Sequence, residues 1–268
     1  MYFEKIKKGA VISAGIFTAV LSLEAMEPMR AFAAEPTVIA EAEQAVCETI
    51  PEIKLEKKTY WKDNKLHDCL TDESRKELAI WVSELEIDGE RVFPNISPEL
   101  LEGQWLKESR FFVEATNGEN GTGECVGLSQ SSCRWNIDFT KKWCYVVGED
   151  PDLVNTKEDA RRILLEYPEV NALVQASQLQ KYYNQCPQAY KDNPEKYALA
   201  IYRWGNISDA QVEYDGTNTY CDEVLKNAFN LEDEYDRYRM SLLREEKRRP
   251  VLPTRTACEK YSVEDILV

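Results

Sequence analysis

The feature that most constrains the fold is a pair of helix starts in which a capping residue is followed directly by proline. These starts are Ser97-Pro98 and Asn193-Pro194. A capping side chain accepts a hydrogen bond from a free backbone N–H group in the first turn. Proline fits the first helical position because the N–H group that it lacks would have no partner within the helix there. They predict one helix from Pro98 to about Arg110 and another that ends at Gly205.

Apolar residues at helical spacing predict three further helices. One begins at Thr71 or Asp72 and ends before Asp88, one begins at Thr156, and one spans about Asn171 to Tyr183. The chain is therefore expected to be mainly helical.

The composition is that of a water-soluble chain with one main domain and extra segments. It has 268 residues, of which 43% are apolar and 30% charged. The formal net charge of -15 argues against nucleic acid and against an anionic membrane surface, since both favour a basic face. We therefore expect no nucleic-acid partner.

The first 34 residues are typical of a secretion signal. Three lysines precede an apolar run from Ala10 to Leu23, and small residues near Ala34 offer a cleavage site. A retained membrane anchor is the alternative, but the run is shorter than the roughly 20 residues that a spanning helix needs. A mature chain that begins near Glu35 would be secreted or associated with the cell envelope.

Eight cysteines follow the predicted signal, and an even number in an exported chain predicts disulfides. We expect Cys125 and Cys133 to hold a loop region, and Cys47, Cys69 and Cys258 to fasten the terminal segments. A zinc site is the alternative, but the chain has no C-x-x-C spacing and a single histidine. No metal and no cofactor are expected.

Glu108 is the candidate acid on the helix that begins at Pro98. At 100° per residue, Leu101, Trp105, Glu108 and Phe112 lie on one stripe. A carboxyl group among apolar neighbours loses hydration of its charged form, so its pKa rises toward the value that a general acid needs. The alternative is a boundary glutamate that reaches water or pairs with a neighbouring lysine or arginine.

Four segments in chain order, within roughly Ile96 to Leu225, resemble the soluble lytic transglycosylases, which are peptidoglycan lyases of the lysozyme superfamily. Glu108-Ser109 is similar to the Glu-Ser pair that ends the family's first core helix. The other matching segments are Val126 to Gln130, Val170 to Leu179 and Tyr197 to Gly205. The chain departs from the family pattern at Ser129, Gln175 and Arg203, where methionine, glycine and asparagine are usual.

The resemblance implies a fold and a division of the chain. The fold would be α+β and mainly α, lysozyme-like, with a helical core and a small hairpin or loop region at Asn117 to Cys133 flanking a glycan cleft. The predicted segments are a signal peptide at 1–34, an extension at 35–70, the lysozyme-like domain at 71–225 and a C-terminal helix and tail at 226–268.

The resemblance also implies an activity, cleavage of the bond between N-acetylmuramic acid and N-acetylglucosamine with formation of a 1,6-anhydro ring. Glu108 would act first as acid and then as base. Tyr202 would hydrogen bond near Glu108 and help to set its protonation, and Gln130 would orient the substrate or the acid. The residues expected to bind the glycan strand are Ser109, Gly127, Leu128, Gln130 and Tyr202.

Two other classes of function fit parts of this pattern. A muramidase would share the fold but use water and a second carboxylate, for which Asp138 or Glu124 is the candidate. A wall-binding protein without activity, or a component of a cell-envelope assembly such as a secretion apparatus, would keep the cleft without needing an acid, and Arg203 favours that alternative. The sequence makes no prediction of oligomeric state.

Overall fold

The computed structural model describes residues 47–51, 53–62, 65–87, 89–117, 124–205, 207–216, 219–246 and 254–258. The chain divides into two units, Met1–Gln44 and Ala45–Val268, and all described residues belong to the second. The predicted signal and its cleavage site therefore lie outside the described residues.

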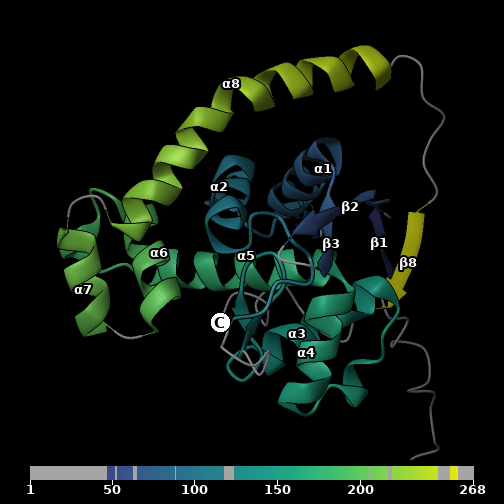
Figure 1. The fold of residues 1–268 in the computed structure, drawn as a ribbon, viewed down its shortest axis with the longest axis horizontal. Helices are drawn as coiled ribbons and strands as arrows, with labels where there is room; N and C mark the ends of the chain where they lie inside the picture. The colour runs from purple at the N-terminus through teal and green to yellow at the C-terminus, as the bar shows by residue number, and fades with distance from the viewer. Residues whose placement is uncertain are drawn as a thin grey trace, which may run out of the picture. The chain divides into compact units, whose positions relative to one another are not determined.

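The described part is mainly helical, with short antiparallel strand pairs between the helices (Figure 1). This confirms the mainly helical α+β class. The α-helices are α1 (Asp72–Ser83), α2 (Pro98–Glu108), α3 (Ile137–Trp143), α4 (Lys157–Glu166), α5 (Pro168–Asn184), α6 (Pro194–Trp204), α7 (Ile207–Asp215) and α8 (Tyr220–Glu246). Three short 3-10 helices span Cys144–Val147, Pro151–Leu153 and Gln188–Tyr190.

The strands pair two by two, and each pair is antiparallel. The pairs are β1 (Cys47–Pro51) with β8 (Thr254–Cys258), β2 (Lys57–Lys62) with β3 (Lys65–Leu70), β4 (Glu86–Ile87) with β5 (Glu90–Arg91), and β6 (Cys125–Val126) with β7 (Ser131–Ser132). The β1–β8 pair brings the two ends of the second unit together.

The predicted helix starts are confirmed by their caps. The side chains of Thr71, Ser97, Thr156 and Asn193 each accept a hydrogen bond from a backbone N–H in the first turn of the helix that follows. Gly205 ends α6 with a φ of 67°, a left-handed conformation that glycine adopts without strain. Local chemistry therefore fixes where these helices begin.

Helix α5 is the central element of the core. Figure 1 shows it crossing between α1 and α2 on one side and α3 and α4 on the other. Its residues are buried over most of its length, and it begins at Pro168, three residues before the predicted start. A helix enclosed on several sides shows little apolar periodicity, which accounts for this difference at its start.

Helices α2 and α8 pack with their backbones close together at Gly103. A Cβ atom at this position would lie 2.8 Å from the Ala228 nitrogen and 3.0 Å from the Val224 oxygen. Only glycine permits this approach without a backbone shift. The contact holds the start of α8 against α2, although the predicted domain boundary at 225 falls inside α8.

The predicted extension at 35–70 is joined to the helical body through β3. The backbone N–H of Val113 donates to the Asp68 oxygen at 3.0 Å, and Cys69 forms an isolated antiparallel bridge with Phe112. Leu70 is 1% exposed. The base of the β2–β3 hairpin is therefore part of the core.

The described cysteines differ from expectation. The thiols of Cys69, Cys125, Cys133, Cys144 and Cys186 are free, so the expected bridges are absent at these positions. In the β6–β7 pair, Cys125 lies opposite Ser132, and Cys133 directly follows the end of β7. Backbone hydrogen bonds hold this hairpin instead. The side chains of Cys47 and Cys258 lie outside the described residues.

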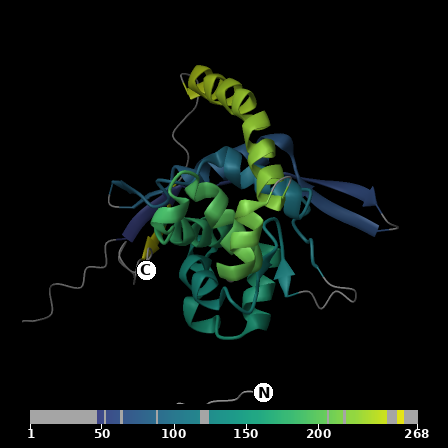
Figure 2. The same cartoon turned by 90° about the vertical axis from the view of Figure 1, so that its left-hand side faces the viewer.

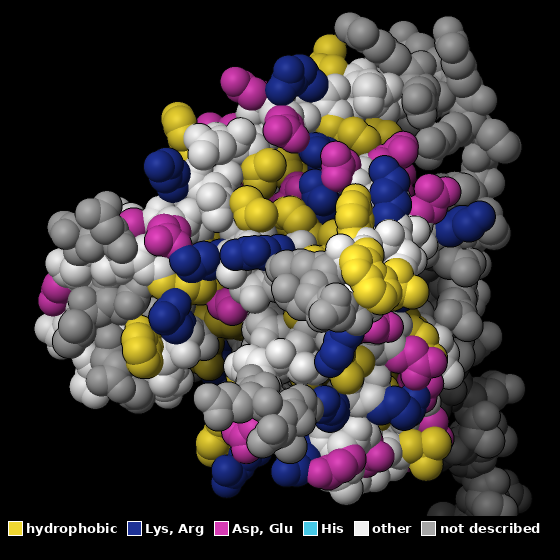
Figure 3. All heavy atoms as spheres, viewed as in Figure 1, with side chains coloured by type: hydrophobic (Ala, Val, Ile, Leu, Met, Phe, Trp, Pro, Cys, Tyr) yellow, Lys and Arg dark blue, Asp and Glu magenta, His cyan; other side chains and the backbone are white. Residues whose placement is uncertain are grey.

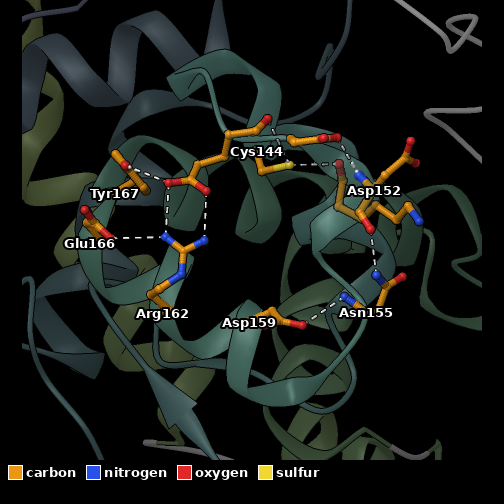
Figure 4. A network of polar contacts seen from close by, with 10 residues as sticks. Cys144, Asp152, Asn155, Asp159, Arg162, Glu166 and Tyr167 are labelled. Atoms are coloured by element: carbon orange, nitrogen blue, oxygen red, sulfur yellow. Dashed lines mark hydrogen bonds and ion pairs between the residues drawn. The ribbon is translucent and has the colours of Figure 1, made fainter.

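A polar network fastens the turn after α3 to α4 (Figure 4). The guanidinium of Arg162 forms two hydrogen bonds to the Glu149 carboxylate, at 3.0 and 2.8 Å, and a third to Glu166 at 3.3 Å. The Tyr167 hydroxyl donates to the same Glu149 carboxylate at 3.0 Å. The hydrogen bond from Arg162 is the main cause that lowers the pKa of Glu149. We interpret the network as structural.

Candidate active site around Glu108

Glu108 is the last residue of α2, and its side chain is half-buried. The helix ends there because Arg110 and Phe111 adopt φ angles of 54° and 68°, which are incompatible with a right-handed helix. The predicted extension to Arg110 is therefore wrong. The predicted stripe holds for Trp105, which is fully buried, but Phe112 lies beyond the helix.

The pKa of Glu108 is raised above the ordinary carboxyl value because burial disfavours the charged form. The hydrogen bond from Tyr220 and the charges of Arg203 and Lys107 act in the opposite direction, but burial outweighs them. The Lys107 ammonium pairs with Glu223. Glu108 therefore keeps its proton to a higher pH than an exposed glutamate, as the sequence predicted.

Five side chains, which we call the Trp105–Glu108 relay, form a hydrogen-bonded chain that ends at the acid. The indole nitrogen of Trp105 donates to Gln175 Oε1 at 2.5 Å. Gln175 Nε2 donates to Gln104 Oε1 at 2.6 Å, and Gln104 Nε2 donates to the Tyr220 hydroxyl at 3.0 Å. That hydroxyl donates to Glu108 Oε1. The relay links α2, α5 and α8.

The direction of every hydrogen bond in the relay follows from Trp105, because an indole N–H can donate but cannot accept. The indole N–H requires the Gln175 amide to turn its oxygen toward Trp105, which leaves its NH2 group to donate to Gln104. The Gln104 amide therefore turns its oxygen toward Gln175 and its NH2 group toward Tyr220. The Tyr220 hydroxyl therefore accepts from Gln104 and must give its own proton to Glu108. When Glu108 is neutral, its acidic proton is consequently carried by Oε2.

Arg203, a departure from the family pattern, belongs to this site. Its guanidinium carbon lies 4.5 Å from the centre of the Tyr220 ring and 5.2 Å from that of Trp204. A cation over an aromatic face is attracted by the ring quadrupole. The positive charge also favours the ionised form of Glu108. Arg203 therefore stabilises the carboxylate that remains after Glu108 has given up its proton.

Asn171 of α5 anchors the β6–β7 hairpin. Its Oδ1 accepts from the backbone N and the Oγ of Ser129, at 2.9 and 2.7 Å. Its Nδ2 donates to the carbonyl oxygens of Val126 and Leu164, at 3.0 and 3.3 Å. A Cβ on Gly127 would lie 2.3 Å from that Nδ2, and Gly127 has a φ of 75°. Glycine at this position is what lets Asn171 reach the hairpin.

The predicted role of Tyr202 needs correction. Its hydroxyl donates to the Ser129 carbonyl oxygen at 2.9 Å and lies 3.2 Å from Ser131 Oγ. The hydroxyl that bonds to Glu108 belongs to Tyr220. Tyr202 therefore ties the hairpin to α6. Burial raises its pKa, with a smaller contribution from the charge of Glu108.

The other predicted contacts with the glycan are occupied within the protein. Gln130 Nε2 donates to the carbonyl oxygens of Ala115 and Gly127, both at 3.0 Å. Leu128 is fully buried in the core. Ser109 is buried, and its Oγ donates back into the last turn of α2 at 3.2 Å. These side chains make their contacts within the protein, and their role toward a substrate stays a prediction.

The two candidates for a second carboxylate, Glu124 and Asp138, are both exposed. Glu124 directly precedes Cys125 on the hairpin. Burial raises the pKa of the Cys125 thiol, and the charges of Glu108 and Glu124 both add to this effect. Both Glu108 and Glu124 therefore lie near enough to Cys125 for their charges to act on its thiol.

Three residues of the site were not predicted as such: Gln104, Gln175 and Tyr220. Gln104 lies one turn before Glu108 on α2, and a buried amide at that spacing is a signal that periodicity could have given. The signal at Gln175 was its difference from the resembled family, in which glycine is usual at this position. Tyr220 comes from α8, which carried no motif.

Within the described ranges, no group of three or more His, Cys, Asp or Glu side chains could hold a metal ion. No helix there combines the length and apolarity that a membrane crossing needs. One surface hollow of about 570 Å³ is lined by Glu99, Leu100 and Phe229, among others, and does not include Glu108.

Comparison with known proteins returned no family model, no curated protein and no solved structure that matches this chain. The functional assignment therefore rests on the residues and on the geometry around Glu108.

Proposed function

We propose that this chain is an exported lytic transglycosylase that cleaves peptidoglycan strands with Glu108 as its acid and base. The observation that carries the proposal is the state of Glu108. Its pKa is raised by burial, and a one-directional hydrogen bond from Tyr220 holds Oε1. A carboxyl group whose pKa is raised and whose orientation is fixed meets two requirements of a general acid.

The proposed reaction uses the two oxygens of Glu108 differently. Oε2 carries the proton and gives it to the glycosidic oxygen between N-acetylmuramic acid and N-acetylglucosamine. The resulting carboxylate is stabilised by the Tyr220 hydroxyl and by the charge of Arg203. It then takes the proton of the muramic C6 hydroxyl, whose oxygen attacks the anomeric carbon and closes the 1,6-anhydro ring. Water takes no part in this reaction.

The proposal includes a lysozyme-like arrangement in which the β6–β7 hairpin borders the glycan site. Asn171 and Tyr202 support this idea, since they fix the hairpin to α5 and α6 by hydrogen bonds. In this view Gly127, Leu128 and Gln130 shape the hairpin rather than grip the sugar. Their substitution would then act through the position of the hairpin.

The test is mass spectrometry of the muropeptides that the purified protein releases from cell-wall sacculi. The proposal predicts products that end in 1,6-anhydro-N-acetylmuramic acid. Reducing ends would identify a muramidase, with Glu124 as the first candidate for the second carboxylate. Absence of any product, with binding to sacculi retained, would favour the non-catalytic wall-binding alternative.

A further inference from the structure

The β2–β3 hairpin exposes three large apolar side chains, of which Tyr60 lies on one face and Trp61 and Leu66 lie on the other. Trp61 is 68% exposed, Leu66 is 64% exposed and Tyr60 is 50% exposed. Trp61 and Leu66 are paired in the strand register, so they lie side by side on one face of the hairpin. Exposed apolar side chains that are contiguous mark interaction sites more often than isolated ones do.

The charge of this hairpin is opposite to that of the chain. The net charge of the whole chain is -15, yet the segment from Lys54 to Asp68 holds five lysines and only three acidic residues. Among the described side chains of this segment, the exposed lysines are Lys54, Lys57, Lys58 and Lys65. Figure 3 shows one face of the molecule, on which exposed apolar side chains stand among basic and acidic ones.

The base of the hairpin is held firmly, whereas the outer ends of β2 and β3, which we call its tip, project beyond the helices (Figure 2). Thr59 donates to Asp68 at 2.8 Å across the two strands, and the His67 ring lies 5.0 Å from that of Phe112. A rigid base presents the tip in a fixed orientation, which lowers the entropic cost of binding.

We propose that the tip of the β2–β3 hairpin docks on the surface of an anionic lipid bilayer. Trp61 and Tyr60 would sit at the level of the headgroups, where tryptophan and tyrosine are enriched in membrane proteins. Leu66 would enter the acyl boundary beside Trp61, and the lysines would face anionic headgroups. The average acidity of the chain argued against such a surface, but the charge of the hairpin favours it.

Other occupants fit less well. A glycan strand could stack on Trp61 but offers no apolar phase for Leu66. A stable protein interface buries about 20–30 residues on each side, whereas the hairpin exposes three large apolar side chains. The combination of an aromatic ring, an aliphatic side chain and flanking lysines is met by an anionic membrane surface.

The experiment is co-sedimentation of the full chain with vesicles of phosphatidylglycerol and phosphatidylcholine, and with vesicles of phosphatidylcholine alone. We expect binding to the anionic vesicles that weakens as salt is added. The double variant Trp61→Ser with Leu66→Ser should lower the partition coefficient about tenfold or more. Lys58→Gln and Lys65→Gln should each lower it about fivefold.

Trp135→Ser is the matched control, because Trp135 is 73% exposed and lies beside Arg134 but outside the hairpin. It should bind vesicles like the wild type. Equal binding to neutral vesicles, an equal loss in the Trp135 variant, or no vesicle binding at all would overturn the proposal. So would a Trp61-dependent affinity for lipid-free sacculi without affinity for vesicles. The vesicle assay is independent of glycan cleavage, so either proposal can fail alone.

Discussion

The Tyr220 hydroxyl donates its hydrogen bond to Glu108 Oε1 across 112 positions of the chain. The two residues meet because Gly103 lets the start of α8 approach α2 closely. The buried side-chain amide of Gln104, on α2, donates to the Tyr220 hydroxyl and so determines which way that hydroxyl points. The orientation of the proposed acid therefore depends on the packing of two helices.

Replacement of Tyr220 by phenylalanine should raise the pKa of Glu108 further, because the hydrogen bond from Tyr220 favours the carboxylate. Activity that needs protonated Glu108 falls as pH rises through this pKa. The alkaline limb of the pH–rate profile should therefore move to higher pH, and the maximal rate should fall on the order of tenfold.

The matched control for this variant is Tyr214→Phe, which also removes a hydroxyl that donates to a carboxylate, here Asp192 at 3.0 Å. Its pH–rate profile should coincide with that of the wild type. A limb that stays in place in Tyr220→Phe would show that the hydroxyl does not act on the acid.

Arg203→Met should move the same limb in the same direction, because the charge of Arg203 lowers the pKa of Glu108. Arg203 is exposed, so solvent screening keeps this shift smaller than the charge would cause inside the protein. Arg203→Lys keeps the charge and should retain most of the wild-type profile. A pH–rate profile that is unchanged in both variants would show that the charge of Arg203 does not act on Glu108.

Gly127→Ala should destabilise the protein, because the new Cβ would lie 2.3 Å from Asn171 Nδ2 at a left-handed φ. Gly89→Ala separates the two causes, since Gly89 has a φ of 79° and no atom within 4 Å of a new Cβ. The Gly89→Ala substitution should lower the free energy of unfolding by about 1 kcal/mol. In urea unfolding, Gly127→Ala should cost clearly more. Equal costs would mean that Asn171 does not anchor the hairpin.

The sequence predicted the helix starts because a cap and a proline act within one turn. From the stripe shared with Trp105, it placed Glu108 among apolar neighbours on this helix and predicted a raised pKa. It could not predict where α2 ends, since the left-handed geometry of Arg110 and Phe111 leaves no mark in those residue types.

The partner of Glu108 could not be predicted because it is a long-range contact. The expected tyrosine, Tyr202, lies in a segment that resembles a family motif, whereas Tyr220 is positioned by the packing of α8 on α2. The relay through Gln175 depends in turn on the alignment of α5. Which of these side chains meet is decided only by the way the helices pack against one another.

Glu108→Gln should stabilise the protein in a pH-dependent manner. Since the folded-state pKa of Glu108 is raised, the ionised carboxylate weakens folding at any pH above the unfolded-state pKa. The gain in unfolding free energy from glutamine should therefore be small in acid and should grow toward neutral pH.

The control on the same helix is Glu102→Gln. Glu102 is fully buried and pairs with Arg75 at 3.1 Å and with the Tyr235 hydroxyl at 2.6 Å. Its substitution removes one of the two carboxylate partners of Arg75, which keeps its ion pair with Asp72 at 2.9 Å, and should lower the free energy of unfolding by about 1–3 kcal/mol. Thermal midpoints measured across pH compare the two variants, and a lower midpoint for Glu108→Gln at neutral pH would contradict the buried-acid assignment.

The most direct test of the central claim is the rate of anhydro-muropeptide release by wild type and Glu108→Gln from the same sacculi. The amide keeps the shape of the side chain and can still accept from Tyr220, but it cannot transfer the proton. We predict that the wild type forms anhydro ends and that the variant, although folded, forms them at least about a hundredfold more slowly. Release at nearly the wild-type rate would show that Glu108 is not the acid.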